Sequence, residues 1–105
     1  MNQNKLFNMI FYALDNQYDL NEDEELGDFL SLMNPFLFKG EGSADPSVYQ
    51  NFKNEYESRF ENECNEEEGY YFAKKWLEKQ NSKAIIEAFN SVTLKEWIDA
   101  VNAIE

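Results

Sequence analysis

The stretch "NEEEGYYFAKKWLEKQ" at residues 65–80 decides the fold class of this chain. Asn65, followed three residues later by Glu68, is typical of a capping box at the start of a helix. Glutamates fill the first turn and lysines follow later, an order of charges that the helix dipole favours. Apolar residues recur at helical spacing and are expected to face the core: Tyr70, Ala73, Trp76 and Leu77. We therefore predict a helix over about 66–80.

Two further helix starts follow toward the C-terminus. Ser82 begins a shorter apolar pattern, which comprises Ile85, Ile86 and Phe89. Thr93 with Glu96 forms the best capping box in the chain. The apolar residues after it lie on one helical face: Leu94, Trp97, Ile98 and Val101. We predict a short helix after Ser82 and an amphipathic last helix to about residue 104.

Two helices are expected in the first third of the chain. One apolar face predicts a helix over about 4–18: Leu6, Phe7, Ile10, Phe11, Leu14 and Tyr18. Asn21 then offers an N-cap with Glu24 three residues on, and the acidic first turn suits the helix dipole. The buried face of this second helix comprises Leu26, Phe29, Leu30 and Met33. It should end at Asn34, because a residue that precedes proline disfavours helical geometry.

The glycine-containing stretch "FKGEGSADPSVY" at residues 38–49 is expected to be a turn before another helix. Asp45 as a cap and Pro46 in the first turn are typical of a helix start. A phosphate-binding loop would need a lysine and a hydroxyl after its last glycine, or a third glycine, and the stretch has neither. The helix should run to about residue 63 with a break near 64 or 65, and its inward residues are Tyr49, Phe52, Tyr56 and Phe60.

These patterns predict an all-α fold, a single compact domain of five or six short helices over residues 1–105. No strand-like alternation bounded by hairpin turns occurs, and 105 residues suit one core. The chain carries 21 acidic and 9 basic residues, a net charge of −12, but its 16% aromatic content supplies enough apolar surface for folding. We expect some of these rings to be exposed, because they exceed what the helix faces absorb.

Catalytic equipment is scarce, so we predict a protein that is not an enzyme and that has no cofactor. The chain has no histidine, the commonest general base and a frequent metal ligand. Cys64 stands among glutamates, which weaken it as a nucleophile. Asp19, Asn21 and Asp23 match the first ligands of a calcium loop, but the later glycine and glutamate positions do not match. No metal-binding residue is therefore predicted.

Acidic residues gather at 22–25 and from 55 to 68. These acidic residues form either solvated helix faces or a docking surface for a basic partner. The neighbouring Tyr70 and Tyr71 belong either to the centre of an interface or to a second layer of the core. The candidate partner-binding residues are Glu22, Asp23, Glu24, Glu25, Glu61, Glu63, Glu66, Glu67, Glu68, Tyr70 and Tyr71. Helix-dipole pairing accounts for most of the basic stripe, which comprises Lys74, Lys75, Lys79 and Lys83.

We expect a small helical interaction module (an accessory protein, regulator, immunity protein or inhibitor) that binds a basic protein partner. A self-assembling structural protein and a carboxylate-based metal-binding module are the alternatives. The negative charge disfavours direct binding to nucleic acid or to a membrane surface. A lone cysteine and the lack of a signal-peptide pattern or of an apolar run of about 20 residues favour the cytoplasm.

The run "LMNPFLFKGEGSADPSVYQNFK" at residues 32–53 resembles a segment of small, uncharacterised bacterial proteins of unknown function. The resemblance covers about a quarter of the chain. It implies a cytoplasmic bacterial protein. It implies no activity and no catalytic residue.

Overall fold

The computed structural model describes residues 1–35 and 42–104. Within these ranges the regular structure is helical throughout and contains no strand. The helices are α1 (Gln3–Asn21), α2 (Glu24–Met33), α3 (Pro46–Arg59), α4 (Glu66–Glu78), α5 (Lys83–Asn90) and α6 (Leu94–Ile104). The prediction of an all-α fold with five or six helices is confirmed. Residues 38–41 of the expected turn lie outside the described residues.

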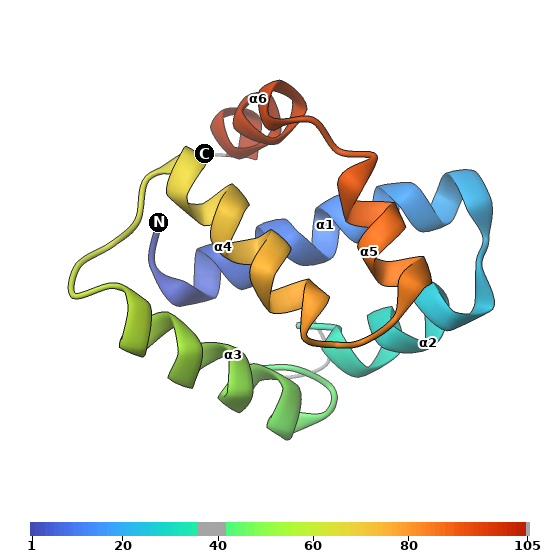
Figure 1. Ribbon diagram of the computed structural model, residues 1–105, viewed down its shortest axis with the longest axis horizontal. Helices are drawn as coiled ribbons and strands as arrows, with labels where there is room; N and C mark the ends of the chain where they lie inside the picture. Colours follow the sequence, from blue (N-terminus) through green and yellow to red (C-terminus); the bar gives the residue numbers. More distant parts are fainter. Residues whose placement is uncertain (36–41, 105) are drawn as a thin grey trace.

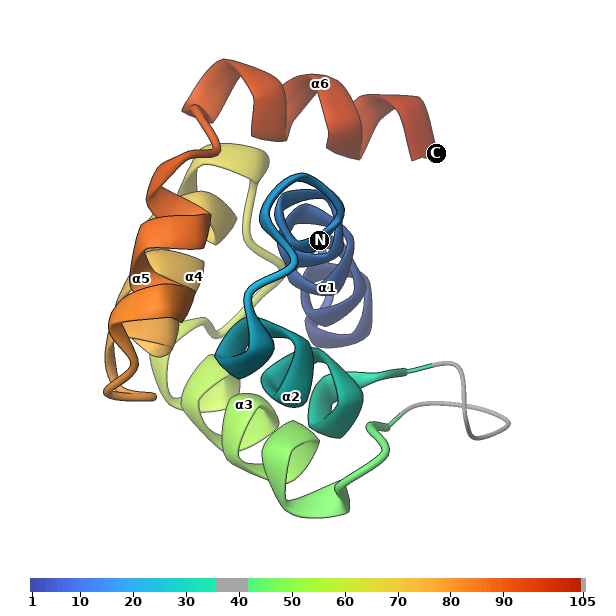
Figure 2. The same ribbon diagram turned by 90° about the vertical axis from the view of Figure 1, so that its right-hand side faces the viewer.

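Helix α1 lies at the centre of the molecule, and the other helices pack around it (Figures 1 and 2). It contacts α2, α3 and α5, while α4 packs against α5 and α6. Figure 2 looks nearly along α1 and shows α6 crossing above it, α4 and α5 on one side, and α2 and α3 below. This position explains the large apolar face of α1, whose buried residues are Leu6, Phe7, Met9, Ile10, Phe11 and Leu14.

Most of the predicted helix starts are confirmed. Asp45 caps α3 ahead of Pro46, and Ser82 caps α5. Asn65 and Glu68 form the capping box of α4, with Asn65 Oδ1 accepting from Glu68 N at 2.8 Å and Glu68 Oε1 accepting from Asn65 N at 3.0 Å. The same reciprocal bonds join Thr93 and Glu96 at 3.1 Å each.

The predicted cap at Asn21 is wrong. Helix α1 begins at an Asn2 cap and continues to Asn21, and Glu22 then turns the chain with a left-handed backbone (φ 50°). Asp23 is the residue that caps α2, because its Oδ1 accepts from Leu26 N at 3.1 Å.

Helix α3 ends at Arg59, four residues earlier than predicted. Phe60 is extended, with φ −123° and ψ 127°, so it leaves the helix although it continues the apolar pattern of α3. A contact between distant segments accompanies this early end. Tyr56 donates its hydroxyl proton to Met1 O, and Cys64 N lies 3.2 Å from both Met1 O and the Tyr56 hydroxyl oxygen.

Most aromatic rings of the described residues pack into two clusters. The first cluster joins α1, α2, α3 and α4 and comprises Phe7, Phe29, Tyr49, Phe52, Tyr56, Phe60, Phe72 and Trp76. The second cluster joins α4, α5 and α6 and comprises Tyr70, Tyr71, Phe89 and Trp97. Of the rings in residues 1–35 and 42–104, Tyr71 is the exposed one, at 50%. The expectation that some rings are exposed therefore holds for Tyr71, while most other described rings are buried or partly buried because rings of different helices pack on one another.

Each tryptophan anchors one cluster by a hydrogen bond at the edge of the core. Trp76 Nε1 donates to Asn51 Oδ1 on α3 at 3.0 Å, and Trp97 Nε1 donates to Glu66 O at 2.9 Å. Both indoles are almost wholly buried, so these bonds satisfy donors that would otherwise be costly to bury. None of the described helices combines the length and the apolar character that crossing a membrane would require.

Candidate functional site

The structure divides the predicted acidic residues between two ends of the molecule. Residues 22–25 lie at the α1–α2 junction, whereas residues 61–68 lie in the α3–α4 connection and the first turn of α4 (Figure 1). These groups are at opposite ends of the view, so they do not form one continuous surface. A partner that contacts one group need not contact the other.

The two tyrosines of the prediction have different positions. Tyr70 is 4% exposed, and its hydroxyl donates to Val92 O, so it belongs to the core. Tyr71 is half exposed and borders a groove between α3 and α4. Of this pair, Tyr71 alone is accessible to a partner.

A groove that we call the acidic groove lies between α1 and α2. It has a volume of about 460 Å³ and is lined by Phe11, Asp15, Tyr18, Glu22, Glu24, Gly27, Asp28, Leu30, Ser31 and Asn34. Four of these residues are acidic and none is lysine or arginine. The acidic groove should therefore attract positively charged groups.

The local sequence explains how α1 and α2 form the acidic groove. A Cβ atom at Gly27 would lie 2.8 Å from Tyr18 Cε2, so the absence of a side chain at Gly27 admits the tyrosine ring. Glu24 and Asp28 are four residues apart on α2, and this spacing places them on one helix face. The sequence prediction did not include Asp15 and Asp28. The spacing of four residues from Glu24 indicates that Asp28 shares its helix face.

Not every residue of the predicted cluster at 22–25 lines the acidic groove. Glu22 and Glu24 do, but Asp23 and Glu25 do not. Asp23 has a structural task as the cap of α2. We therefore assign the candidate site to Asp15, Glu22, Glu24 and Asp28.

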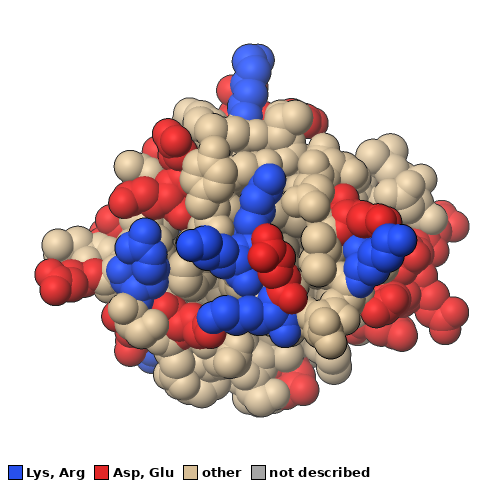
Figure 3. All heavy atoms as spheres, in the orientation of Figure 1, with Lys and Arg blue, Asp and Glu red and all other residues tan. Residues whose placement is uncertain are grey.

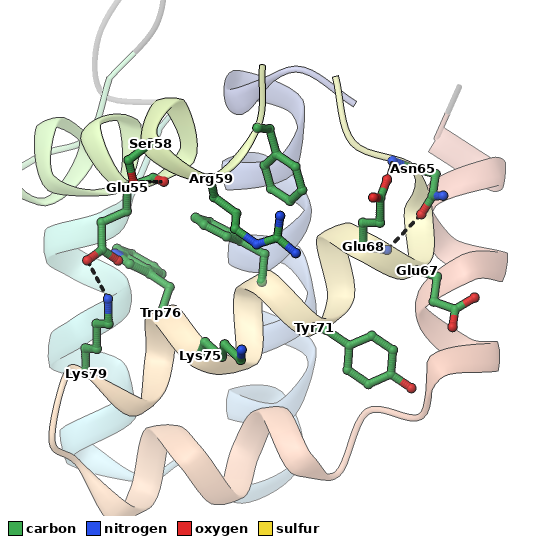
Figure 4. A pocket seen from close by; sticks show the side chains of 12 residues that line it. Glu55, Ser58, Arg59, Asn65, Glu67, Glu68, Tyr71, Lys75, Trp76 and Lys79 are labelled. Atoms are coloured by element: carbon green, nitrogen blue, oxygen red, sulfur yellow. Dashed lines mark hydrogen bonds and ion pairs between the residues drawn. The ribbon is translucent and has the colours of Figure 1, made fainter. Parts of the chain in front are cut away.

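A second groove, which we call the basic groove, lies between the end of α3 and α4. It has a volume of about 420 Å³, and its lining comprises Glu55, Ser58, Arg59, Phe60, Asn65, Glu67, Glu68, Tyr71, Phe72, Lys75, Trp76 and Lys79 (Figure 4). Figure 3 shows several lysine and arginine side chains over the middle of the molecule, with carboxylates both among them and around the edges. We name the groove for its three cations, although three carboxylates also line it. The sequence prediction attributed Lys75 and Lys79 to helix-dipole pairing. Lys75 is four residues from both Tyr71 and Lys79, and this spacing is the signal for a shared helix face.

Cys64 has the environment of a structural thiol. Its side chain is 2% exposed, and burial raises the pKa of the thiol. Asp19 and Asn21 are helical residues of α1, so the calcium-loop resemblance at 19–23 does not correspond to a loop. Across residues 1–35 and 42–104, no group of three or more carboxylates or thiols is placed to hold a metal ion.

The chain is a small all-α protein with two grooves, one lined by four carboxylates and no cation, the other by three cations and three carboxylates. Comparisons with protein-family models, with curated proteins and with solved structures found no match.

Proposed function

We propose that this chain is a small helical interaction protein that binds a basic protein partner at the acidic groove. It would act as an accessory protein, regulator, immunity protein or inhibitor by occupying the partner's surface. The observation that carries the proposal is the lining of the acidic groove, which has four carboxylates and no cation. Complementary charge of this kind raises the rate of association and selects among partners.

Charge alone would give weak binding, because an exposed ion pair contributes only about 0–1 kcal/mol. Apolar contacts are needed in addition, and exposed leucines are available nearby. Leu20 is 76% exposed at the end of α1, two residues before Glu22, and Leu32 is 47% exposed on α2, next to Ser31 of the groove lining. We therefore propose a partner segment with lysine or arginine residues for the groove and apolar residues for these leucines.

The test is capture of partners by the tagged protein from an extract of its native cells. One variant neutralises the groove: Asp15→Asn, Glu22→Gln, Glu24→Gln and Asp28→Asn. A matched control variant neutralises four exposed carboxylates elsewhere: Glu57→Gln, Glu78→Gln, Glu87→Gln and Asp99→Asn. Asp23 stays unchanged in both because it caps α2.

We expect the wild type and the control variant to retain one basic protein at low salt, and the groove variant to lose it. The captured basic protein should also dissociate from the wild type at about 1 M salt, because the Debye length falls to about 3 Å and the charges are screened. Equal retention by both variants would show that charge at the acidic groove is not the determinant. Recovery of the chain alone would instead favour the alternative of self-assembly, which sedimentation over a wide concentration range measures directly.

We further propose that the protein has no catalytic activity and is a cytoplasmic, bacterial protein. The lack of histidine and the burial of Cys64 support the first statement. The single cysteine and the resemblance of residues 32–53 support the second. The metal-binding alternative is tested by thermal melting with calcium, magnesium or manganese, because an ion that binds the folded state raises the melting temperature.

A further inference from the structure

We infer that the basic groove is a second binding site, and that it takes a small aromatic carboxylate. This inference is independent of the proposed protein partner, because the acidic groove is formed by α1 and α2 and the basic groove by α3 and α4 with their connection. Three observations carry it: cations without a carboxylate partner, an aromatic wall, and a volume suited to one or two rings.

Arg59 and Lys75 approach the basic groove from α3 and α4 (Figure 4). Within the part of the chain that the structure describes, neither makes an ion pair, although the chain has 21 acidic residues for 9 basic ones. The Arg59 guanidinium lies 5.1 Å from the centre of the Phe60 ring. An anion in the groove could contact either cation, and each contact would be favourable.

The carboxylates of the basic groove are engaged or directed elsewhere. Glu55 pairs with Lys79 at 2.7 Å, and Glu68 accepts from Asn65 N in the capping box of α4. Figure 4 shows Glu67 at the far end of the groove, beyond Tyr71 and away from Arg59. Glu67 and Glu68 keep their charge, but neither forms an ion pair with Arg59 or Lys75 among the described residues, so the donors of these two cations are available to a ligand.

Beside these cations the wall of the groove is aromatic. Phe60 and Phe72 lie with ring centroids 5.4 Å apart, and Trp76 and the half-exposed Tyr71 also line the groove. Aromatic rings favour edge and offset contacts with another ring. The volume of about 420 Å³ falls within the range of small-molecule sites, roughly 300–1,000 Å³. A ligand ring would lie along Phe72 and Tyr71, close to the edge of Trp76, and its carboxylate would reach Arg59, whose fork of donors matches two carboxylate oxygens.

The two tryptophans provide an internal control for the test. Trp76 lines the basic groove, whereas Trp97 belongs to the second cluster and donates to Glu66 O. In a ¹H–¹⁵N spectrum their indole N–H groups give one signal each. Indole-3-acetate is the probe, and indole-3-acetamide is its neutral analogue of the same shape.

We expect indole-3-acetate in the millimolar range to shift the Trp76 signal and to leave the Trp97 signal in place. Arg59→Gln and Lys75→Gln should each weaken binding by roughly tenfold or more, because each substitution removes a charge-assisted hydrogen bond to the carboxylate. Lys83→Gln on α5 is the matched control and should bind as the wild type does, because Lys83 lies outside the groove. An unchanged Trp97 signal in each variant shows that the fold is intact.

Two results would overturn the inference. One is a Trp76 signal that does not move with indole-3-acetate. The other is equal binding of the acetate and the amide, which would show that the two cations do not contribute.

Discussion

Replacing Tyr56 by phenylalanine tests how the connection between α3 and α4 is held. Tyr56 is 5% exposed, and its hydroxyl donates to Met1 O and accepts from Cys64 N at 3.2 Å. The substitution removes both bonds and keeps the ring that packs on Phe60. Each such bond contributes about 0.5–1.5 kcal/mol. The free energy of unfolding should therefore fall by about 1–3 kcal/mol at neutral pH.

The same variant should change how stability depends on alkaline pH. Burial of Tyr56 raises its pKa from 10.0 to about 12, because the folded state disfavours the charged phenolate. A group whose pKa is higher in the folded state stabilises that state below its unfolded pKa and loses this contribution as pH rises through the folded pKa. The wild type should thus lose roughly 2–3 kcal/mol between about pH 10 and 12. The Tyr56→Phe variant lacks the titrating group, so the gap between the two proteins should close over this range.

Urea unfolding followed by tryptophan fluorescence at several pH values measures both effects. Tyr71→Phe is the matched control, since the Tyr71 side chain is half exposed and its hydroxyl makes no hydrogen bond within the described residues. The control should change stability by less than about 0.5 kcal/mol. A loss of that small size for Tyr56→Phe, or a gap that stays constant from pH 7 to about 12, would refute the reasoning.

Three further predictions concern single residues. Cys64 should react with iodoacetamide at the rate of unfolding rather than as a free thiol, because it is 2% exposed and burial raises its pKa; fast labelling of the folded protein would contradict this. Thr93→Ala should cost about 1 kcal/mol in urea unfolding by removing the hydroxyl that caps α6, whereas Thr93→Ser should restore it. Gly69→Ala should destabilise despite a helix-propensity gain of about 1 kcal/mol, because its Cβ would lie 2.7 Å from Met1 Cε and 3.0 Å from Leu6 Cδ1; a higher melting temperature would show that both side chains can move.

Helix starts could be predicted because their signals are local. Asp45, Asn65 and Thr93 each bond to backbone within three residues, so the sequence contains both partners of the interaction. The α1–α2 junction was mispredicted because Asn21 and Asp23 both suit an N-cap. The left-handed turn at Glu22, which lies between them, decides in favour of Asp23.

The end of α3 could not be predicted, because it coincides with contacts across the whole chain. Phe60 continues the helical spacing of Tyr56 and Phe52, yet the chain is already extended there. The contact between Cys64 Sγ and Met1 O joins residues that are 63 positions apart, and no local sequence pattern predicts it. The grooves escaped prediction for the same reason: each is formed where two helices meet, and the sequence indicates only which residues share one helix face.

The two proposed sites can be tested separately although Trp76 touches elements of both. Its ring lies 6.2 Å from that of Phe29 on α2, the helix that carries Glu24 and Asp28, so a partner at the acidic groove could shift the Trp76 signal indirectly. An anionic probe removes this ambiguity, because four carboxylates repel it from the acidic groove. A Trp76 shift that depends on the charge of the probe and disappears in Arg59→Gln therefore reports the basic groove, whatever binds at α1 and α2.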